Sequence, residues 1–225
     1  MGAADIIVRP YRAEDRQMVR DVCYETGYMG DSPSWYWRDV ESFADLWSRY
    51  YTDREPESLF VGTRPDGVVV GYLLGCVDSS EANEFNRLVG YHAVRRYCLL
   101  RPGTAGFMWR TMGDVVRDNV VGRRPLAAPL HDERWPAHLH IDLLPEARAG
   151  GVGRRLMGLW LDRLRELEVP GCHVETLAEN SRAVAFFEAT GFVKYEAPLM
   201  VPGMRRREGG RMHLQRLVQD LRAAR

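Results

Sequence analysis

A glycine-rich turn between an apolar stretch and an amphipathic pattern is the feature that most constrains the fold of this chain. The turn reads Arg148-Ala149-Gly150-Gly151-Val152-Gly153 and follows the apolar stretch 137–143. Apolar residues then recur at helical spacing, and we expect that helix to end at Pro170-Gly171. The predicted apolar face of the helix consists of Val152, Leu156, Leu159, Trp160, Leu164 and Leu167.

The composition of this turn suits an anion, and a phosphate in particular. The first turn of a helix presents backbone N–H groups without intrahelical partners, and the helix dipole makes that end positive. Glycines at 150, 151 and 153 remove the side chains that would keep a phosphate from these N–H groups. The pattern matches neither a Walker loop nor G-x-G-x-x-G. We therefore expect a phosphate site of another kind.

Two motifs occupy the C-terminal half of the chain. The first, PEARAGGVG, runs from Pro145 to Gly153, and the second, ENSRAVAFFEATGF, contains Asn180, Phe187 and Gly191. Both resemble motifs of the GNAT superfamily of N-acetyltransferases, in which the first binds acetyl-CoA. Ala149 stands where that motif commonly has glycine. The opening residues IIVRPYRAED are similar to the first strand and turn of the same superfamily.

This resemblance implies an α/β (α+β) fold with a mixed, mostly antiparallel sheet. A central pair of parallel strands splays apart in that fold, and helices cover both faces. We expect one domain over residues 1–225 with a helical insertion at about 78–136. The stretches EPESLFVG and HLHIDLLPEARAGGVGRRLM are also similar to the acetyltransferase-like domain attached to O-GlcNAcase.

The resemblance further implies how acetyl-CoA is held. Its pantetheine arm enters between the splayed strands, and the thioester oxygen meets a backbone N–H near Leu143 or Leu144. Asn180 reaches the donor or else caps the helix that begins near Ser181. The implied donor-binding residues are Leu143, Leu144, Arg148, Ala149, Gly150, Gly151, Val152, Gly153, Arg154, Asn180 and Phe187.

The sequence H-x-H-x-D at residues 138–142 permits two interpretations. In a strand, His138, His140 and Asp142 share one face, and two imidazoles so spaced can bind one metal ion. Metallohydrolases continue this pattern with a histidine after the aspartate, where this chain has Leu143. The spacing therefore favours a strand that lines a cleft, with no metal.

An amine acceptor must lose a proton before or as it attacks a thioester. The candidate bases are Asp142, His140 and Glu175, and each has an alternative structural role. Histone-acetylating members of the superfamily have a glutamate near the start of this strand, where this chain has Ala137. Many members also have a tyrosine at Phe187 whose hydroxyl protonates the departing thiolate. Tyr195, a water, or release of coenzyme A as thiolate are the alternatives.

The remaining chain predicts further elements of the fold. A strand at Ile6–Val8 precedes a helix that ends near Gly27, and residues 59–63 and 68–77 form a hairpin around Asp66-Gly67. An aromatic stripe of Phe43, Leu46, Trp47 and Tyr50 predicts a second helix. Two later apolar patterns predict helices over 85–97 and 107–120.

Composition excludes several classes of protein. Basic and acidic residues balance at 31 each, which argues against a nucleic-acid partner. The longest apolar run, Val68–Val77, is too short to cross a bilayer, so we expect no membrane partner. Four separated cysteines indicate buried free thiols in a reducing cytoplasm. The sequence gives no indication of oligomeric state.

These observations predict an acetyl-CoA-dependent N-acetyltransferase that transfers the acetyl group directly to an amine. The acceptor is a small-molecule amine or a peptide or protein lysine, and Asp114, Asp118 or Asp132 could face its positive charge. The alternative is a non-catalytic acetyl-CoA-binding or protein-interaction module, suggested by Phe187 and Ala137. A metallohydrolase is the third hypothesis.

Overall fold

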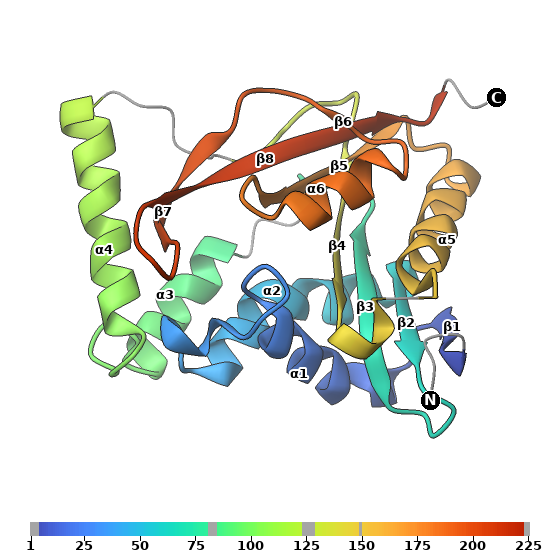
Figure 1. Ribbon diagram of the computed structural model, residues 1–225, viewed down its shortest axis with the longest axis horizontal. Coiled ribbons are helices and arrows are strands. Elements are labelled where there is room, and N and C mark those ends of the chain that lie inside the picture. Colours follow the sequence, from blue (N-terminus) through green and yellow to red (C-terminus); the bar gives the residue numbers. More distant parts are fainter. Residues whose placement is uncertain (1–4, 81–84, 123–128, 149, 223–225) are drawn as a thin grey trace.

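A mixed eight-stranded sheet forms the centre of the molecule (Figure 1). The computed structural model describes residues 5–80, 85–122, 129–148 and 150–222. The strands follow the order β1-β2-β3-β4-β5-β8-β6, and β7 also pairs with β8. Their bounds are β1 Ile7–Pro10, β2 Leu59–Thr63, β3 Val69–Cys76, β4 Ala137–Leu143, β5 Gly171–Leu177, β6 Val193–Lys194, β7 Leu199–Arg205 and β8 Arg211–Asp220.

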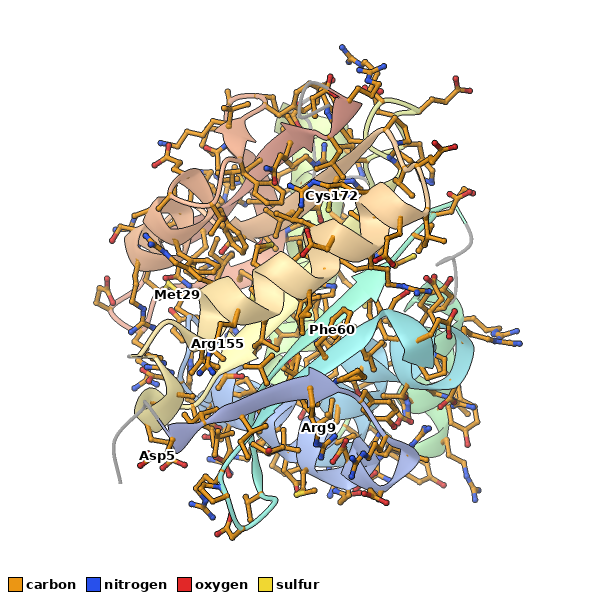
Figure 2. All side chains as sticks on the ribbon, turned by 90° about the vertical axis from the view of Figure 1, so that its right-hand side faces the viewer. Asp5, Arg9, Met29, Phe60, Arg155 and Cys172 are labelled. Atoms are coloured by element: carbon orange, nitrogen blue, oxygen red, sulfur yellow. The ribbon has the colours of Figure 1, made fainter. Side chains whose placement is uncertain are left out.

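Helices cover both faces of this sheet, as expected. One apolar core joins the sheet to α5 and α6, and a second joins it to α1 and α2. Figure 2 looks onto α5, which crosses the near face of the sheet. The α-helices are α1 Arg16–Thr26, α2 Val40–Arg54, α3 Phe85–Arg95, α4 Ala105–Val116, α5 Val152–Glu166 and α6 Ser181–Glu188.

The predicted hairpin is confirmed and forms β2 and β3. Gly67 has a φ of 87°, which explains why a glycine occupies the turn. All eight residues of β3 are buried because the strand lies between β2 and β4 with helices on both sides. The first strand begins one residue later than predicted and continues to Pro10.

Helix α5 follows the glycine turn as predicted, but two of the residues expected on its buried face are exposed. Leu156, Trp160 and Leu164 are completely buried. Leu159 is 38% exposed and Leu167 is 48% exposed, so assigning them to the apolar face was wrong. The helix ends at Glu166, before Pro170-Gly171, because the chain turns away there.

Strands β4 and β5 are the parallel pair, and they stay together over only two residues each. Ala137 pairs with Cys172 and His138 with His173, and the pairing of the two strands ends there. The other neighbours hold both strands in place, since β3 pairs with β4 as far as Leu143 and β8 pairs with β5 as far as Leu177. The two central strands therefore part toward their carboxyl ends, as the splayed fold requires.

The predicted insertion contains α3 and α4, and α4 stands at one end of the molecule beside β7 (Figure 1). It ends four residues earlier than predicted and continues as a π-helical turn. The buried carboxylate of Asp114 accepts from both Nη atoms of Arg205, at 2.7 and 2.8 Å, and from Arg211. Asp118 also accepts from Arg211. These ion pairs fix α4 against β7 and β8.

The four cysteines, Cys23, Cys76, Cys98 and Cys172, are buried free thiols, as expected. Burial raises the pKa of the Cys23 and Cys172 thiols to about 12, so both stay protonated at neutral pH. In the described part of the chain, no helix combines the length and apolar character needed to cross a membrane.

A pair of glycine variants tests the packing of α5 on the sheet. A Cβ at Gly75 would lie 2.3 Å from the Trp160 ring. We therefore expect Gly75→Ala to lower the free energy of unfolding by about 1–3 kcal/mol through overpacking. Gly158 lies within α5 with no atom near its Cβ position. Gly158→Ala should leave stability unchanged or raise it by about 1 kcal/mol. Urea titration of both proteins checks this, and equal losses would contradict it.

Candidate active site

The side chains of β4 alternate between the two faces of the sheet, as the sequence predicted. Ala137 and Leu139 lie in the core shared with α5. The side chains of His138, His140 and Asp142 project to the other side, toward α1 and α2. There His138 and His140 contact Tyr51 of α2. The three polar side chains thus belong to the face that carries the aromatic helix α2.

Asp142 is positioned by a tyrosine from the neighbouring strand. The Tyr72 hydroxyl donates to Asp142 Oδ2 at 2.7 Å, and the two residues are register partners in β3 and β4. Burial raises the pKa of Asp142 to about 6, although Tyr72, Thr26 and Arg148 each act to lower it. A carboxylate with such a pKa can exchange a proton near neutral pH.

His138 is held by hydroxyl groups on both ring nitrogens. Nε2 lies 2.7 Å from the Tyr51 hydroxyl, and Nδ1 lies 2.7 Å from Ser79 Oγ. Ser79 Oγ donates its single proton to the Pro136 carbonyl at 2.6 Å, so Nδ1 must carry the proton shared with Ser79. Nε2 therefore accepts from Tyr51. Both nitrogens are engaged, and His138 has none left for a metal ion.

His140 is surrounded by aromatic rings. Its ring centroid lies 5.4 Å from that of Tyr51 and 5.9 Å from that of Trp47, both edge to face. Burial, together with the charge of the nearby His173, lowers the pKa of His140 to about 4. The imidazole is therefore neutral at pH 7, where it is a weaker base than Asp142. Among the residues that the structure describes, no three His, Cys, Asp or Glu side chains could hold a metal ion.

Glu175 and Tyr195 are committed to other contacts. Arg216 donates to Glu175 Oε1 at 2.7 Å and to Glu196 at 2.7 Å. Tyr195 packs edge to face against Trp135, with ring centroids 4.8 Å apart, just before β4 begins. That is the end where β4 and β5 remain paired. The structure thus places Tyr195 away from the parted ends of the strands.

The glycine turn leads directly into α5. Gly150 and Gly151 have φ values of 71° and 73°, which favour glycine, and both are exposed. No atom of the other described residues lies within 4 Å of a Cβ built on Gly151, so as far as the structure describes the chain, the space in front of the helix start is open. Val152 is buried, and Arg154 is exposed in the first turn. Ala149 lies outside the described residues.

Helix α6 closely approaches the same helix start. A Cβ on Gly153 would lie 3.1 Å from the Phe186 ring and 3.4 Å from the Leu143 side chain. Asn180 accepts from the Ala183 N–H at 3.2 Å and is itself the N-cap, whereas Ser181 is the first helical residue. Phe187 is 4% exposed and packs against Phe192 in the α5 core.

The two leucines at the end of β4 differ in their backbone contacts. The Leu144 N–H donates to the Val70 carbonyl at 2.9 Å, so β3 takes that donor. Hydrogen bonds alternate along an antiparallel strand, and the Leu143 N–H therefore points away from β3, toward β5. Pairing with β5 ends well before this residue. The N–H of Leu143, and not that of Leu144, therefore points into the space between the parted strands β4 and β5.

Arg148 crosses the end of β4. Its Nε donates to the Leu143 carbonyl at 3.0 Å, and its Nη2 donates to the Gly30 carbonyl. Arg182 of α6 donates to the neighbouring Met29 carbonyl at 3.4 Å. Burial and the charge of Arg182 lower the pKa of Arg148. The guanidinium groups of Arg148 and Arg182 thus bind the carbonyls of two neighbouring residues, Gly30 and Met29.

A sequence model of the acetyltransferase (GNAT) family matches residues 28–192, which is most of the chain. The chain belongs to the GNAT acetyltransferase family. The sequence therefore indicated the correct family, and the splayed strand pair is the one expected for it.

Similar proteins with solved structures agree with this family. The crystal structure of SsHAT is 26% identical and covers 96% of this chain and 98% of its own, with a TM-score of 0.64. The structure of yncA from Salmonella typhimurium, solved with its cofactor acetyl-CoA, is 12% identical. It covers 96% of this chain and 94% of its own with a TM-score of 0.57, a likeness of fold alone.

A mycothiol acetyltransferase from Streptomyces griseus subsp. griseus is similar over a short segment. It is 33% identical over 69 residues, which make up 31% of this chain and 22% of that protein. The chain therefore spans about a fifth of the length of this curated relative.

Several residues around the candidate site were not found from the sequence. Tyr72 lies in an apolar stretch, where a buried tyrosine hydroxyl needs a hydrogen-bond partner, whereas Tyr51 lies in the polar stretch SRYYTDR. That requirement was the available signal. Ser79 and Arg182 carried no such signal, since each meets its partner across more than 50 residues of chain.

Proposed function

We propose that this protein is an acetyl-CoA-dependent N-acetyltransferase that transfers the acetyl group directly to an amine. The observation that best supports this proposal is that β4 and β5 part beside an open glycine turn. Asp142 lies on β4, the strand that leads into this turn. A site for the donor and a titratable carboxylate are thereby placed at one end of one strand. The family of the chain supports the same reaction class.

The residues around the parted strands fit coenzyme A. We infer that its diphosphate binds the first N–H groups of α5, beside Gly150, Gly151 and Arg154, where no Cβ obstructs it. The pantetheine arm would extend between β4 and β5, which do not pair with each other beyond His138 and His173, although Arg148 binds the Leu143 carbonyl there. When bound, acetyl-CoA supplies the acetyl thioester.

Asp142 is the proton acceptor in this proposal. Its pKa of about 6 leaves it mostly ionised at pH 7, so it both attracts an ammonium group and can take its proton. The Leu143 N–H would donate to the thioester oxygen and stabilise the negative charge that develops there. His140 would orient the amine as a neutral hydrogen-bonding group. Glu175 is less suited because Arg216 already binds its carboxylate.

The acceptor would enter on the face of the sheet that carries α2. Trp47 and Tyr51 stand next to His140 there, and their ring faces favour a cationic amine. Asp114, Asp118 and Asp132 bind arginines instead. We propose a small-molecule amine or a peptide or protein lysine as the acceptor class.

A second candidate is a non-catalytic acetyl-CoA-binding module, favoured by Phe187. This residue has no proton to give and is buried beside Phe192. The catalytic proposal instead lets coenzyme A leave as a thiolate. Thiol release from acetyl-CoA with a panel of primary amines discriminates the two, because a non-catalytic module binds the donor without releasing thiol.

Donor binding should depend on the open space at Gly151. A glutamine there would extend over the N–H groups of α5, so we expect Gly151→Gln to weaken acetyl-CoA binding by about tenfold or more in isothermal titration calorimetry. Gly67 offers a matched control, since its φ of 87° is also positive and its Cβ position is also empty. Gly67→Gln should bind like the unchanged protein.

The outcome of this titration decides the proposal. If the unchanged protein shows no heat of binding with acetyl-CoA, the proposed function is wrong. Equal affinity in the Gly151→Gln and Gly67→Gln variants would reject the placement of the diphosphate.

The pH dependence of kcat/KM should report the ionisation of Asp142. Only its ionised form accepts a proton, so kcat/KM should fall as the pH drops through about 6. Asp142→Asn should abolish this acid limb together with most of the activity. Tyr72→Phe removes a hydrogen bond to the ionised carboxylate, and we expect the limb to move upward by about 1 pH unit.

Glu175→Gln distinguishes the competing carboxylate. The acid limb should keep its midpoint in this variant, because Glu175 is bound to Arg216. A limb that vanishes in Glu175→Gln and persists in Asp142→Asn would assign the base to Glu175 instead.

A further inference from the structure

A tight turn at residues 28–31 lies against the parted ends of the central strands. Tyr28 and Asp31 exchange two backbone hydrogen bonds, of 2.7 and 2.9 Å. Met29 and Gly30 have φ values of 53° and 91°, so both central residues are left-handed, as in a type I′ turn. Figure 2 places Met29 beside α6, whose Arg182 donates to the Met29 carbonyl at 3.4 Å.

Two guanidinium groups hold this turn by its central carbonyls. Arg148, which directly precedes the glycine turn, donates to the Gly30 carbonyl, and Arg182 of α6 donates to the Met29 carbonyl. A Cβ on Gly30 would lie 2.7 Å from Arg182 Nη2 and 2.8 Å from Arg148 Nη2. The two positive charges therefore meet over a single glycine.

Neither guanidinium is in direct contact with a described carboxylate, although the charges of Asp31 and Asp142 act from farther away to raise the pKa of Arg148. Of the described acidic side chains, none forms an ion pair within 4 Å of Arg148 or Arg182. Two neutral carbonyls are weak compensation for two converging positive charges, whereas a phosphate accepts charge-assisted bonds that are about twice as strong. The pair is better matched to a dianion than to the turn.

We propose that Arg148 and Arg182 form a clasp that exchanges the turn carbonyls for the diphosphate of coenzyme A, so that donor binding releases the 28–31 turn. This inference rests on the proposed donor site. Arg148 lies two residues before Gly150 in the sequence, and the ring of Phe186, which is on the same helix as Arg182, lies 3.1 Å from a Cβ built on Gly153. Both arginines therefore flank the start of α5.

The turn also connects the donor side to the amine side. The Gly30 N–H donates to the Thr26 carbonyl at 3.0 Å, and the Thr26 hydroxyl, which donates to the Val22 carbonyl, acts to lower the pKa of the nearby Asp142. Tyr28 packs on Trp35 with ring centroids 5.2 Å apart and donates to the Arg205 carbonyl at 3.2 Å. Release of the turn would thus change the surroundings of Asp142, the proposed proton acceptor. By linkage, the state of Asp142 would in turn affect binding of the donor.

Hydrogen–deuterium exchange of the unchanged protein tests the clasp without any turnover. The amides of Tyr28 and Asp31 report the turn, because their hydrogen bonds close it. Coenzyme A should increase their exchange rate, since its diphosphate takes the two guanidiniums. Saturating acetylpantetheine, which has no diphosphate, should leave the rate unchanged. Slower or unchanged exchange with bound coenzyme A overturns the proposal, and so does an increase with acetylpantetheine.

A matched pair of variants separates the clasp from general charge effects. We expect Arg182→Gln to weaken coenzyme A binding by about fivefold and to leave acetylpantetheine binding unchanged. Arg165→Gln removes the same charge from the far end of α5, where Arg165 binds Asp162, and should bind both ligands normally. Equal effects of the two variants on coenzyme A would reject the clasp.

The two proposals fail separately in this design. Absence of coenzyme A binding to the unchanged protein would reject the donor site and the clasp together. Normal coenzyme A binding with an unresponsive turn rejects the clasp alone and leaves the proposed function standing.

Discussion

The structure depends on how far two parallel strands remain paired. β4 and β5 bond to each other only at their amino ends, yet each keeps a complete antiparallel partner on its other side. That support keeps both backbones extended where they separate. Backbone N–H and C=O groups in such a position need partners, and an extended ligand arm with amide groups can provide them. The opening between β4 and β5 therefore persists because β3 and β8 hold the outer edges of the two strands.

In the proposed function, the parting of β4 and β5 separates the diphosphate site from the proton acceptor. The glycine turn and α5 begin where β4 ends, so the helix start lies beside the opening. Asp142 precedes the turn on the same strand but projects toward α1 and α2, where Tyr72 binds it. One short segment thus supplies both sides because side chains alternate along a strand while the backbone continues into the helix.

Much of this arrangement could be predicted from local sequence patterns. The glycine turn, the hairpin around Gly67 and the shared face of His140 and Asp142 all follow from spacing and backbone preference. Leu159 and Leu167 were assigned wrongly because periodicity gives the direction of a helical face but not its width. The Leu144 N–H is bound by Val70, a partner that the sequence of β4 alone cannot reveal.

Contacts between distant segments were beyond the reach of such patterns. The turn at Met29 meets Arg182 across 153 residues, and Asp114 fixes α4 to β7 across 91 residues. Each is decided by tertiary packing. Asn180 illustrates the intermediate case, since its capping role was one of two predicted roles and its side chain does accept from Ala183.

The H-x-H-x-D pattern shows why residue type alone does not decide chemistry. A histidine binds a metal through a nitrogen that has no better partner, and the orientation of the ring depends on the other nitrogen. Ser79 and Tyr51 occupy both nitrogens of His138, while aromatic rings surround His140. The hydroxyls fix the first ring, burial keeps the second neutral, and Asp142 is left as the group of this strand that titrates near neutral pH. The neighbouring side chains thus leave Asp142 as the proton acceptor that we propose for this strand.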